Sequence, residues 1–174
     1  MLDKIKLIIL DVDGVLTDGG IVIDGQGDEI KSFSAHDGAG IRYLYRAGLK
    51  AAVITGRKSA AVEARCRDLG IEDVHQKALE KLPPYNAILA KHGLRDEEVC
   101  YIGDDLMDLP PMRRCGFPVA VANARTEVRA AAAYVTVAQG GHGAVREVID
   151  KVLKFQGKWD LIMARYRPDA KRGP

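Results

Sequence analysis

The chain of 174 residues has the length of one domain or slightly more, and its 47% hydrophobic and 29% charged residues are ordinary for a globular protein. A net charge of +2 gives no general reason to bind nucleic acid or an anionic membrane, and no stretch approaches the length that spans a bilayer. Three widely spaced cysteines indicate neither a disulfide framework nor a zinc knuckle, and with an N-terminus unlike a signal peptide they favour the cytoplasm.

Residues 7–18 carry the strongest local signal in the chain. Four apolar residues predict a strand buried on both faces, as in a parallel sheet, and they lead directly into Asp11 and Asp13. Gly14 then permits a sharp turn and the close approach of a ligand. Two neighbouring carboxylates raise each other's pKa unless a cation compensates them, and hard oxygen ligands suit Mg²⁺. We therefore expect a magnesium site at the end of this strand.

Residues 19–33 predict a β-hairpin, because two alternating runs flank a glycine-rich turn at residues 24–28. A two-stranded hairpin is marginally stable alone in water. We expect it to pack against something else, and a second copy of the chain is a reasonable partner.

From residue 37 onwards, short apolar runs alternate with stretches of helical spacing. Asp37 is expected to cap the first of these helices, which Gly48 ends. Single helices between strands indicate βαβ units, so we expect an α/β fold: a Rossmann-like, mostly parallel sheet with helices on both faces. Residues 1–157 form one predicted domain, and 158–174 form a C-terminal tail. Further strands are expected at 51–54, 73–76, 99–102, 118–122 and 134–137, and further helices at 59–69, 83–92, around 110–111, at 126–133 and after residue 143.

Three of the predicted strands end in polar residues of the kind that bind phosphate and metal. Asp11 follows the first strand, Thr55 follows the strand at 51–54, and Asp104 follows the strand at 99–102. Ligands of open α/β sheets bind outside the carboxyl ends of the strands. These side chains therefore predict one site at one edge of the sheet.

Four segments resemble the motifs of the haloacid dehalogenase-like phosphatases. They are the Asp-Val-Asp-Gly-Val-Leu-Thr run from Asp11, the Thr55-Gly56-Arg57 strand end, a downstream lysine, and Gly-Asp-Asp-x-x-Asp at 103–108. The hairpin and the glycine-rich segment 140–147 are similar to the small capless branch that contains 3-deoxy-D-manno-octulosonate 8-phosphate phosphatase. The resemblance covers nearly all of residues 5–157.

The resemblance implies a role for each matched residue. Asp11 would be the nucleophile that forms an aspartyl phosphate, and Asp13 would be the general acid and base. Mg²⁺ would be bound by Asp11, by the backbone carbonyl of Asp13 and by Asp104. Thr55 and the backbone at Gly56 would donate hydrogen bonds to the phosphoryl oxygens.

The phosphate-binding lysine has two candidates, Lys77 and Lys81. Lys81 stands just before the prolines that open a helix, where a cation opposes the helix dipole, and the motif register also falls on it. We therefore favour Lys81. Asp105 and Asp108 would support the metal ligands without binding the metal, with Asp108 orienting the lysine. Alternatively, they are simply acidic residues at a helix N-terminus.

Substrate recognition is expected from arginines. Arg57 can meet a second anionic group, and Arg65 and Arg146 are further candidates for the carboxylate of a sugar acid. Alternatively, Arg57 forms a surface salt bridge. The implied substrate is a phosphorylated sugar acid, 3-deoxy-D-manno-octulosonate 8-phosphate, with a nonulosonate 9-phosphate as the alternative. His142 stands where many octulosonate enzymes have arginine.

The segments between the motifs are too short to hold a cap domain, so the site would be open to water unless a second subunit covers it. The resemblance implies a homotetramer. Two other classes are a non-catalytic oligomerisation module of the same fold and a receiver-type phospho-switch. The presence of Asp11, Asp13, Thr55, Lys81 and Asp104 together disfavours the first. A receiver would not need Asp13 as acid and base, and its nucleophile would not follow the first strand.

Overall fold

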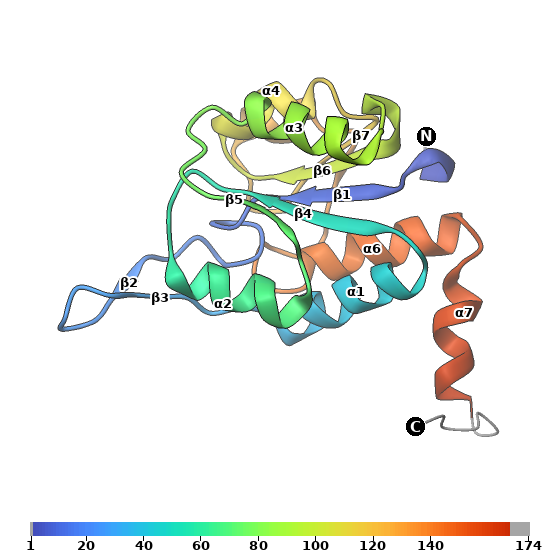
Figure 1. The fold of residues 1–174 in the computed structure, drawn as a ribbon, viewed down its shortest axis with the longest axis horizontal. Helices are drawn as coiled ribbons and strands as arrows, with labels where there is room; N and C mark the ends of the chain where they lie inside the picture. Colours follow the sequence, from blue (N-terminus) through green and yellow to red (C-terminus); the bar gives the residue numbers. More distant parts are fainter. Residues whose placement is uncertain (1, 168–174) are drawn as a thin grey trace.

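The computed structural model describes residues 2–167 and contains a six-stranded sheet in which every neighbouring pair is parallel (Figure 1). The strand order is β5-β4-β1-β6-β7-β8, so the first strand in the chain lies inside the sheet. The predicted α/β fold with a mostly parallel sheet is confirmed. The strands are β1 (Leu7–Leu10), β4 (Lys50–Ile54), β5 (Asp73–His75), β6 (Val99–Gly103), β7 (Phe117–Ala120) and β8 (Tyr134–Val135).

Helices cover both faces of the sheet. In Figure 1, α1, α2 and α6 lie below the sheet, and α3 and α4 lie above it. All four residues of β1 are fully buried, as expected for a strand covered on both sides. The helices are α1 (Ala35–Arg46), α2 (Ala60–Leu69), α3 (Leu82–His92), α4 (Leu109–Met112), α5 (Thr126–Ala131), α6 (Ala144–Phe155) and α7 (Trp159–Met163), with short 3₁₀ turns at Leu2–Lys4, Asp96–Glu98, Leu106–Asp108 and Ala164–Tyr166.

The register of the sheet brings three strand ends together. Leu10 of β1 pairs with Val53 of β4 on one side and with Ile102 of β6 on the other. Because all three strands are parallel, the polar residues that follow them emerge at the same edge. The sheet therefore places the polar strand ends that the sequence singled out side by side.

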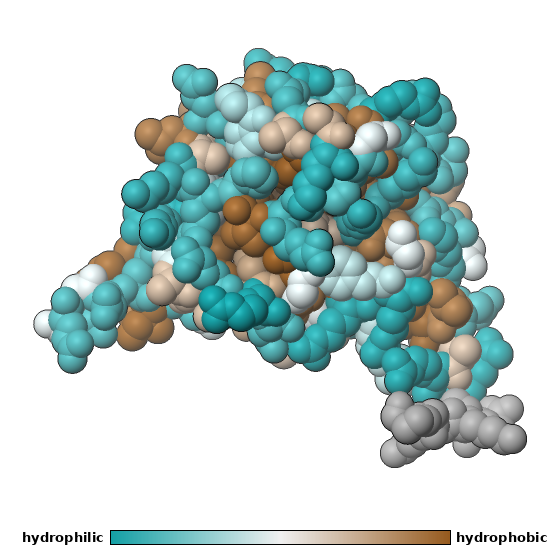
Figure 2. Space-filling view, viewed as in Figure 1, coloured by the Kyte–Doolittle hydropathy of each residue, from teal (hydrophilic) through white to brown (hydrophobic). Residues whose placement is uncertain are grey.

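The hairpin forms as predicted, from β2 (Val22–Ile23) and β3 (Glu29–Ile30), and it projects from the body of the protein (Figure 1). Hydrophobic residues lie on the surface of this arm (Figure 2). We call them the hairpin apolar surface; its members are each more than half exposed, they lie on both sides of the two-stranded hairpin, and they are Ile21, Val22, Ile23 and Ile30.

Asp37 does not cap the helix that the sequence assigned to it. The helix begins at Ala35, two residues before Asp37, and Ser34 caps it. The Ser34 Oγ accepts a hydrogen bond from the Asp37 N–H at 3.3 Å. The Asp37 carboxylate instead accepts hydrogen bonds from the backbone N–H groups of Arg146 at 2.8 Å and Gly143 at 3.3 Å. Those groups are at the N-terminus of α6, where N–H groups lack partners within the helix. Burial raises the pKa of Asp37, and these N–H groups partly offset the effect.

Part of the predicted C-terminal tail is helical and packs on the protein's own body. Ile162 of α7 is buried, and the Trp159 ring meets the Tyr43 ring edge-on at 6.4 Å. Leu161 and Met163 remain exposed. Residues 168–174 of the predicted tail lie outside the described residues. Among residues 2–167, no helix combines the length and apolar character needed to cross a membrane.

Candidate active site

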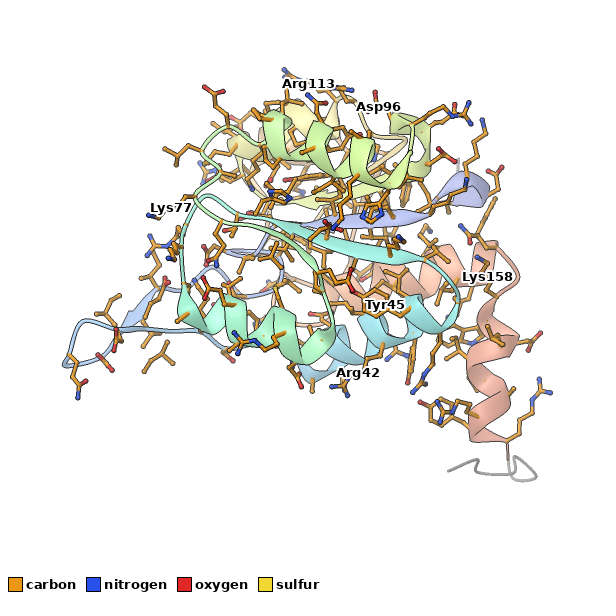
Figure 3. The ribbon with its side chains drawn as sticks, viewed as in Figure 1. Arg42, Tyr45, Lys77, Asp96, Arg113 and Lys158 are labelled. Carbon is orange, nitrogen blue, oxygen red and sulfur yellow. The ribbon has the colours of Figure 1, made fainter. Side chains whose placement is uncertain are left out.

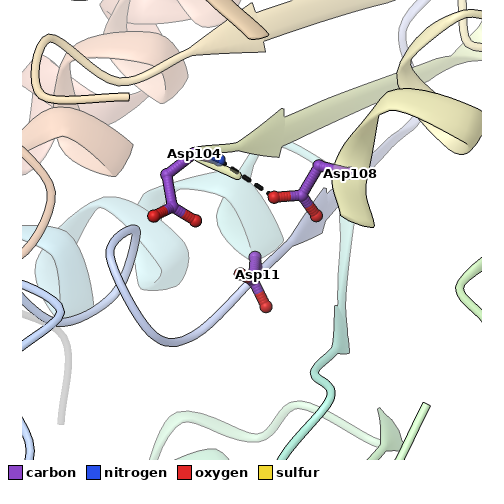
Figure 4. Close-up of side chains that lie close together, drawn as sticks. All are labelled: Asp11, Asp104 and Asp108. Carbon is purple, nitrogen blue, oxygen red and sulfur yellow. Dashed lines mark hydrogen bonds between the residues drawn. The ribbon is translucent and has the colours of Figure 1, made fainter. Parts of the chain in front are cut away.

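Three carboxylates converge at the edge where β1 and β6 end. Asp11 directly follows β1, Asp104 directly follows β6, and Asp108 ends the 3₁₀ turn that comes next (Figure 4). One carboxylate oxygen from each lies within 4.8 Å of the others. This spacing is close enough for the group to surround a single cation.

Lys81 supplies a positive charge to this cluster from the N-terminus of α3. Its Nζ lies 2.9 Å from Asp11 Oδ1 and 2.6 Å from Asp108 Oδ1, and its side chain is 2% exposed. Burial alone would lower the pKa of Lys81, but the two carboxylates outweigh burial and raise it, so the lysine is charged. Lys77, the other candidate, is exposed and lies on a surface loop, where Figure 3 labels it.

Asp108 has all its hydrogen-bonding positions filled. Its Oδ1 accepts from Lys81 Nζ and from the Tyr101 hydroxyl at 2.8 Å. Its Oδ2 accepts from the backbone N–H of Asp104 at 2.9 Å, the bond drawn in Figure 4, and from that of Asp105 at 3.3 Å. A carboxylate accepts about four hydrogen bonds. Asp108 therefore fixes the loop after β6 and the lysine, and Asp11 and Asp104 remain to contact a metal.

Asp104 has a carboxylate oxygen that such a metal would contact. Its Oδ1 is buried and has no hydrogen-bond partner among the described residues. Burial, the charges of Asp11 and Asp108, and a hydrogen bond with Asp11 raise the pKa of Asp104 to about 8. Burial and Asp108 raise the pKa of Asp11 to about 6, although Lys81 opposes them. With three carboxylates around one lysine, the cluster has more negative than positive groups. Because Mg²⁺ prefers oxygen ligands, these residues fit that ion.

Asp13 faces a different set of groups from Asp11. Its Oδ1 accepts a hydrogen bond from Lys31 Nζ at 2.5 Å, and its Oδ2 lies 3.9 Å from Arg57 Nε. Sequence reasoning did not identify Lys31, whose side chain is 1% exposed. The one sequence signal for Lys31 was the alternation of side chains along the hairpin. This alternation puts Lys31, the residue after β3, on the same side as Glu29.

The loop after β4 holds Thr55, Gly56 and Arg57 at the same edge. Thr55 is buried, its N–H donates to the carbonyl of His75 at 2.9 Å, and its own carbonyl accepts from Ala78 at 3.0 Å. Arg57 donates from Nη2 to Glu29 Oε1 at 3.0 Å. The structure therefore brings Arg57 to Asp13 and the hairpin, and its contact with Glu29 is a salt bridge at a half-exposed position.

Two predicted substrate arginines make their contacts elsewhere. Arg65 donates to the carbonyl of Ser34 and pairs with Asp68 at 3.0 Å. Arg146 pairs with Asp150 at 2.6 Å, and its guanidinium lies 4.7 Å from the centre of the Tyr43 ring. These contacts hold both arginines on the helical layer of α1, α2 and α6, and the structure does not group either one with the carboxylate cluster.

Asp105 also has a local partner, although it stands beside Asp104 in the sequence. It is exposed, and its Oδ1 accepts a hydrogen bond from the Leu106 N–H at 2.7 Å, where it caps the 3₁₀ turn Leu106–Asp108. This geometry agrees with the reading of Asp105 as a residue at the N-terminus of a helical turn.

The glycine-rich segment before α6 supports the loop that carries Asp13. The Gly141 N–H donates to the carbonyl of Val15 at 2.9 Å. A Cβ added to Gly140 would lie 1.7 Å from the carbonyl oxygen of Gly14, and a Cβ added to Gly14 would lie 2.0 Å from Asp104 Oδ2. Only glycine permits these approaches.

Comparisons with known proteins agree with this geometry. Residues 70–149 match the model of the haloacid dehalogenase-like hydrolases. Over 158 residues the chain is 47% identical to the 3-deoxy-D-manno-octulosonate 8-phosphate phosphatase of Escherichia coli K12, which covers 91% of this chain and 84% of that protein.

Two solved structures are similarly close. The Moraxella catarrhalis phosphatase of the same name, solved with magnesium, phosphate and a KDO molecule, is 40% identical with a TM-score of 0.93, covering 95% of each chain. The cobalt-bound phosphatase of Haemophilus influenzae is 43% identical with a TM-score of 0.88, covering 90% of this chain and 92% of that one. The chain belongs to the haloacid dehalogenase-like hydrolases and, within them, to the 3-deoxy-D-manno-octulosonate 8-phosphate phosphatases.

Proposed function

We propose that the protein is a Mg²⁺-dependent phosphomonoesterase that hydrolyses 3-deoxy-D-manno-octulosonate 8-phosphate. The observation that carries the proposal is the placement of Asp11 at the end of β1, held by Lys81 and next to the unpartnered oxygen of Asp104. The identity to named phosphatases over nine-tenths of the chain supports the choice of substrate.

We assign the two steps of the reaction to Asp11 and Asp13. The Asp11 carboxylate attacks phosphorus in line, forming an aspartyl phosphate while the bond from phosphorus to the sugar oxygen breaks. Asp13 gives its proton to that oxygen and then takes a proton from the attacking water. The attack of this water on the phosphoryl group breaks the bond to Asp11, releases inorganic phosphate and restores the Asp11 carboxylate. Bound Mg²⁺ supplies positive charge for the phosphoryl oxygens, which lets a carboxylate approach a phosphate.

The remaining residues position these groups. Lys81 holds Asp11 and offers a charged donor to the phosphoryl oxygens, and Asp108 keeps the lysine in place. Thr55 and the backbone at Gly56 are assigned as further phosphoryl donors. Arg57 is assigned to the carboxylate of the sugar acid. Arg65 and Arg146 are further candidates for that carboxylate; within one chain they pair with Asp68 and Asp150.

Phosphate release from a panel of esters tests the proposal. The panel contains the octulosonate 8-phosphate, a nonulosonate 9-phosphate and p-nitrophenyl phosphate, with Mg²⁺ or with excess EDTA. We expect the octulosonate ester to have the highest kcat/KM, EDTA to abolish turnover, and Asp11→Asn to lower kcat by at least about 10³-fold. Turnover that survives the loss of Asp11 would refute the mechanism, and preference for the nonulosonate ester would refute the substrate.

We further propose that the protein is a homotetramer, with the hairpin apolar surface buried between copies. An exposed apolar surface on a projecting arm is typical of a protein–protein contact. Light scattering after size exclusion should give about four times the chain mass of 18.9 kDa. A monomer at micromolar concentration would contradict this assembly.

We place the protein in the cytoplasm. All three cysteines are free and buried, which suits a reducing compartment. Fractionation of cells that produce the protein, with a periplasmic marker as control, tests this placement.

A further inference from the structure

Glu29 of β3 lies between two cations at the edge of the candidate active site. Its Oε1 accepts hydrogen bonds from Lys31 Nζ at 3.1 Å and from Arg57 Nη2 at 3.0 Å. The Glu29 and Lys31 side chains are 12% and 1% exposed, whereas that of Arg57 is 49% exposed. The hairpin therefore holds the arginine that follows β4 through a carboxylate of its own.

Asp13 contacts the same two cations. Lys31 also donates to Asp13 Oδ1, and Arg57 Nε faces Asp13 Oδ2 at 3.9 Å. Burial alone would raise the pKa of Glu29, but Lys31 and Arg57 outweigh burial and lower it, so Glu29 is anionic at neutral pH. In this arrangement Arg57 already has a carboxylate partner before any substrate arrives.

We propose that Glu29 holds Arg57 in the free enzyme as a substitute for the carboxylate of a sugar-acid substrate, and releases Arg57 when that carboxylate binds. The inference rests on the proposed function, because it takes the substrate to carry both a phosphate and a carboxylate. A guanidinium pairs with a ligand carboxylate through the same hydrogen bonds that it makes to glutamate. The exchange therefore conserves the number of ion pairs.

The difference in burial between the two cations allows this exchange. The pair of Arg57 with Glu29 is open to solvent on the arginine side, so water screens it and breaking it costs little. Lys31 is enclosed and keeps its contact with Glu29, so the carboxylate remains compensated after Arg57 leaves. Arg57 is thus the mobile member of the cluster and Lys31 the fixed one.

The exchange makes Glu29 a specificity-determining residue. A phosphate ester that lacks a carboxylate has nothing to offer Arg57 and leaves the pair with Glu29 intact. A carboxylated ester binds Arg57 in competition with Glu29, so Glu29 weakens binding of that class alone. Discrimination between ligands depends on such differences in affinity.

Glu29→Gln tests the proposal because it removes the competing charge and keeps the shape of the side chain. We expect the KM for the octulosonate 8-phosphate to fall about two- to fivefold, the range of an ion pair at this exposure. The KM for mannose 6-phosphate, or its inhibition constant if it acts only as a competitive inhibitor, should not change. Asp28→Asn is the matched control: it removes one charge from the same hairpin at an exposed position, and it should leave both constants unchanged.

The double variant Glu29→Gln/Arg57→Ala shows whether Glu29 acts through Arg57. In an Arg57→Ala background the Glu29→Gln change should no longer alter the KM for the sugar acid. An unchanged or increased KM in the single variant, an equal change for both esters, or an effect that persists without Arg57 would overturn the inference. If the unaltered protein hydrolyses no sugar-acid phosphate, the proposed function itself fails, so the two failures are distinguishable.

Discussion

At the scale of single residues, Lys81 determines whether the buried carboxylates of the site can coexist. We expect Lys81→Met to lower the free energy of unfolding of the metal-free protein by about 3 kcal/mol at neutral pH, because it leaves Asp11 and Asp108 without their buried cation. Urea unfolding in EDTA measures the loss, which should shrink as the pH falls and Asp11 takes up a proton.

Lys77→Met is the matched control for that experiment. Lys77 is exposed, so its replacement should change the free energy of unfolding by no more than about 0.5 kcal/mol. Equal losses in the two variants would show that Lys81 contributes no more than a surface lysine.

The raised pKa values of Asp11 and Asp104 predict how the stability of the metal-free protein depends on pH. These values are about 6 and about 8, above the ordinary value of 3.8, so the native state binds more protons than the unfolded state across this window. The contribution of these two groups to the free energy of unfolding is therefore greatest at low pH, and it is lost as the pH rises from about 4 to about 8. Mg²⁺ favours the ionised carboxylates, so the stabilisation that it provides should increase over the same range.

Thermal unfolding at several pH values, in EDTA and in Mg²⁺, checks this prediction. Asp104→Asn should flatten the EDTA profile and remove most of the response to Mg²⁺. A gap between the two curves that narrows with increasing pH would contradict the assignment of Asp11 and Asp104 as the ion's carboxylate ligands.

The sequence identified some of these residues and missed others for a physical reason. Asp11 and Asp104 follow apolar strands, so a local pattern was enough to find them. Lys31 reaches Asp13 from the hairpin, and its position depends on how the hairpin lies against the sheet. Arg146 remains a predicted substrate residue, and its contacts within one chain, with an aromatic ring and with Asp150, are ones that no local pattern indicates.

At the scale of elements, two loops from distant parts of the chain are fitted together through glycine. Gly140→Ala would drive a Cβ into the carbonyl oxygen of Gly14 and displace the loop that carries Asp13. We expect the free energy of unfolding to fall by about 1–3 kcal/mol. We also expect kcat/KM to fall by about 100-fold, the effect of displacing a reacting group by about 1 Å.

Gly25→Ala provides the comparison, because a Cβ at Gly25 meets nothing within 4 Å. Activity and unfolding of that variant should match the unaltered protein. Full activity in Gly140→Ala would show that the glycine-rich segment does not position the loop of Asp13.

The elements themselves were largely predictable, because apolar runs of strand length and glycine stops mark them in the sequence. Their partners were not. Asp37 lies at a helix start, and the sequence assigned it to that helix; in the fold it caps α6, more than a hundred residues later. Capping needs only a carboxylate near free N–H groups, and tertiary structure decides which helix supplies them.

At the scale of the whole molecule, the hairpin apolar surface predicts how copies assemble. Ile23→Lys places a charge on that surface, so we expect the mass measured by light scattering to fall from a tetramer towards the single-chain mass of 18.9 kDa. Leu161→Lys is the control, because Leu161 is about equally exposed but lies on α7. An assembly unaffected by Ile23→Lys would place the contact elsewhere.

The single tryptophan of the chain lies where the C-terminal helix meets the body of the protein. Trp159 contacts Tyr43 of α1, and the Arg146 guanidinium of α6 lies 6.0 Å from its ring. Tryptophan fluorescence, excited selectively over that of the tyrosines, therefore comes from one indole at one seam. A red shift in its emission with unchanged circular dichroism would report that α7 had detached while the sheet stayed folded, so this seam can be monitored optically without a label.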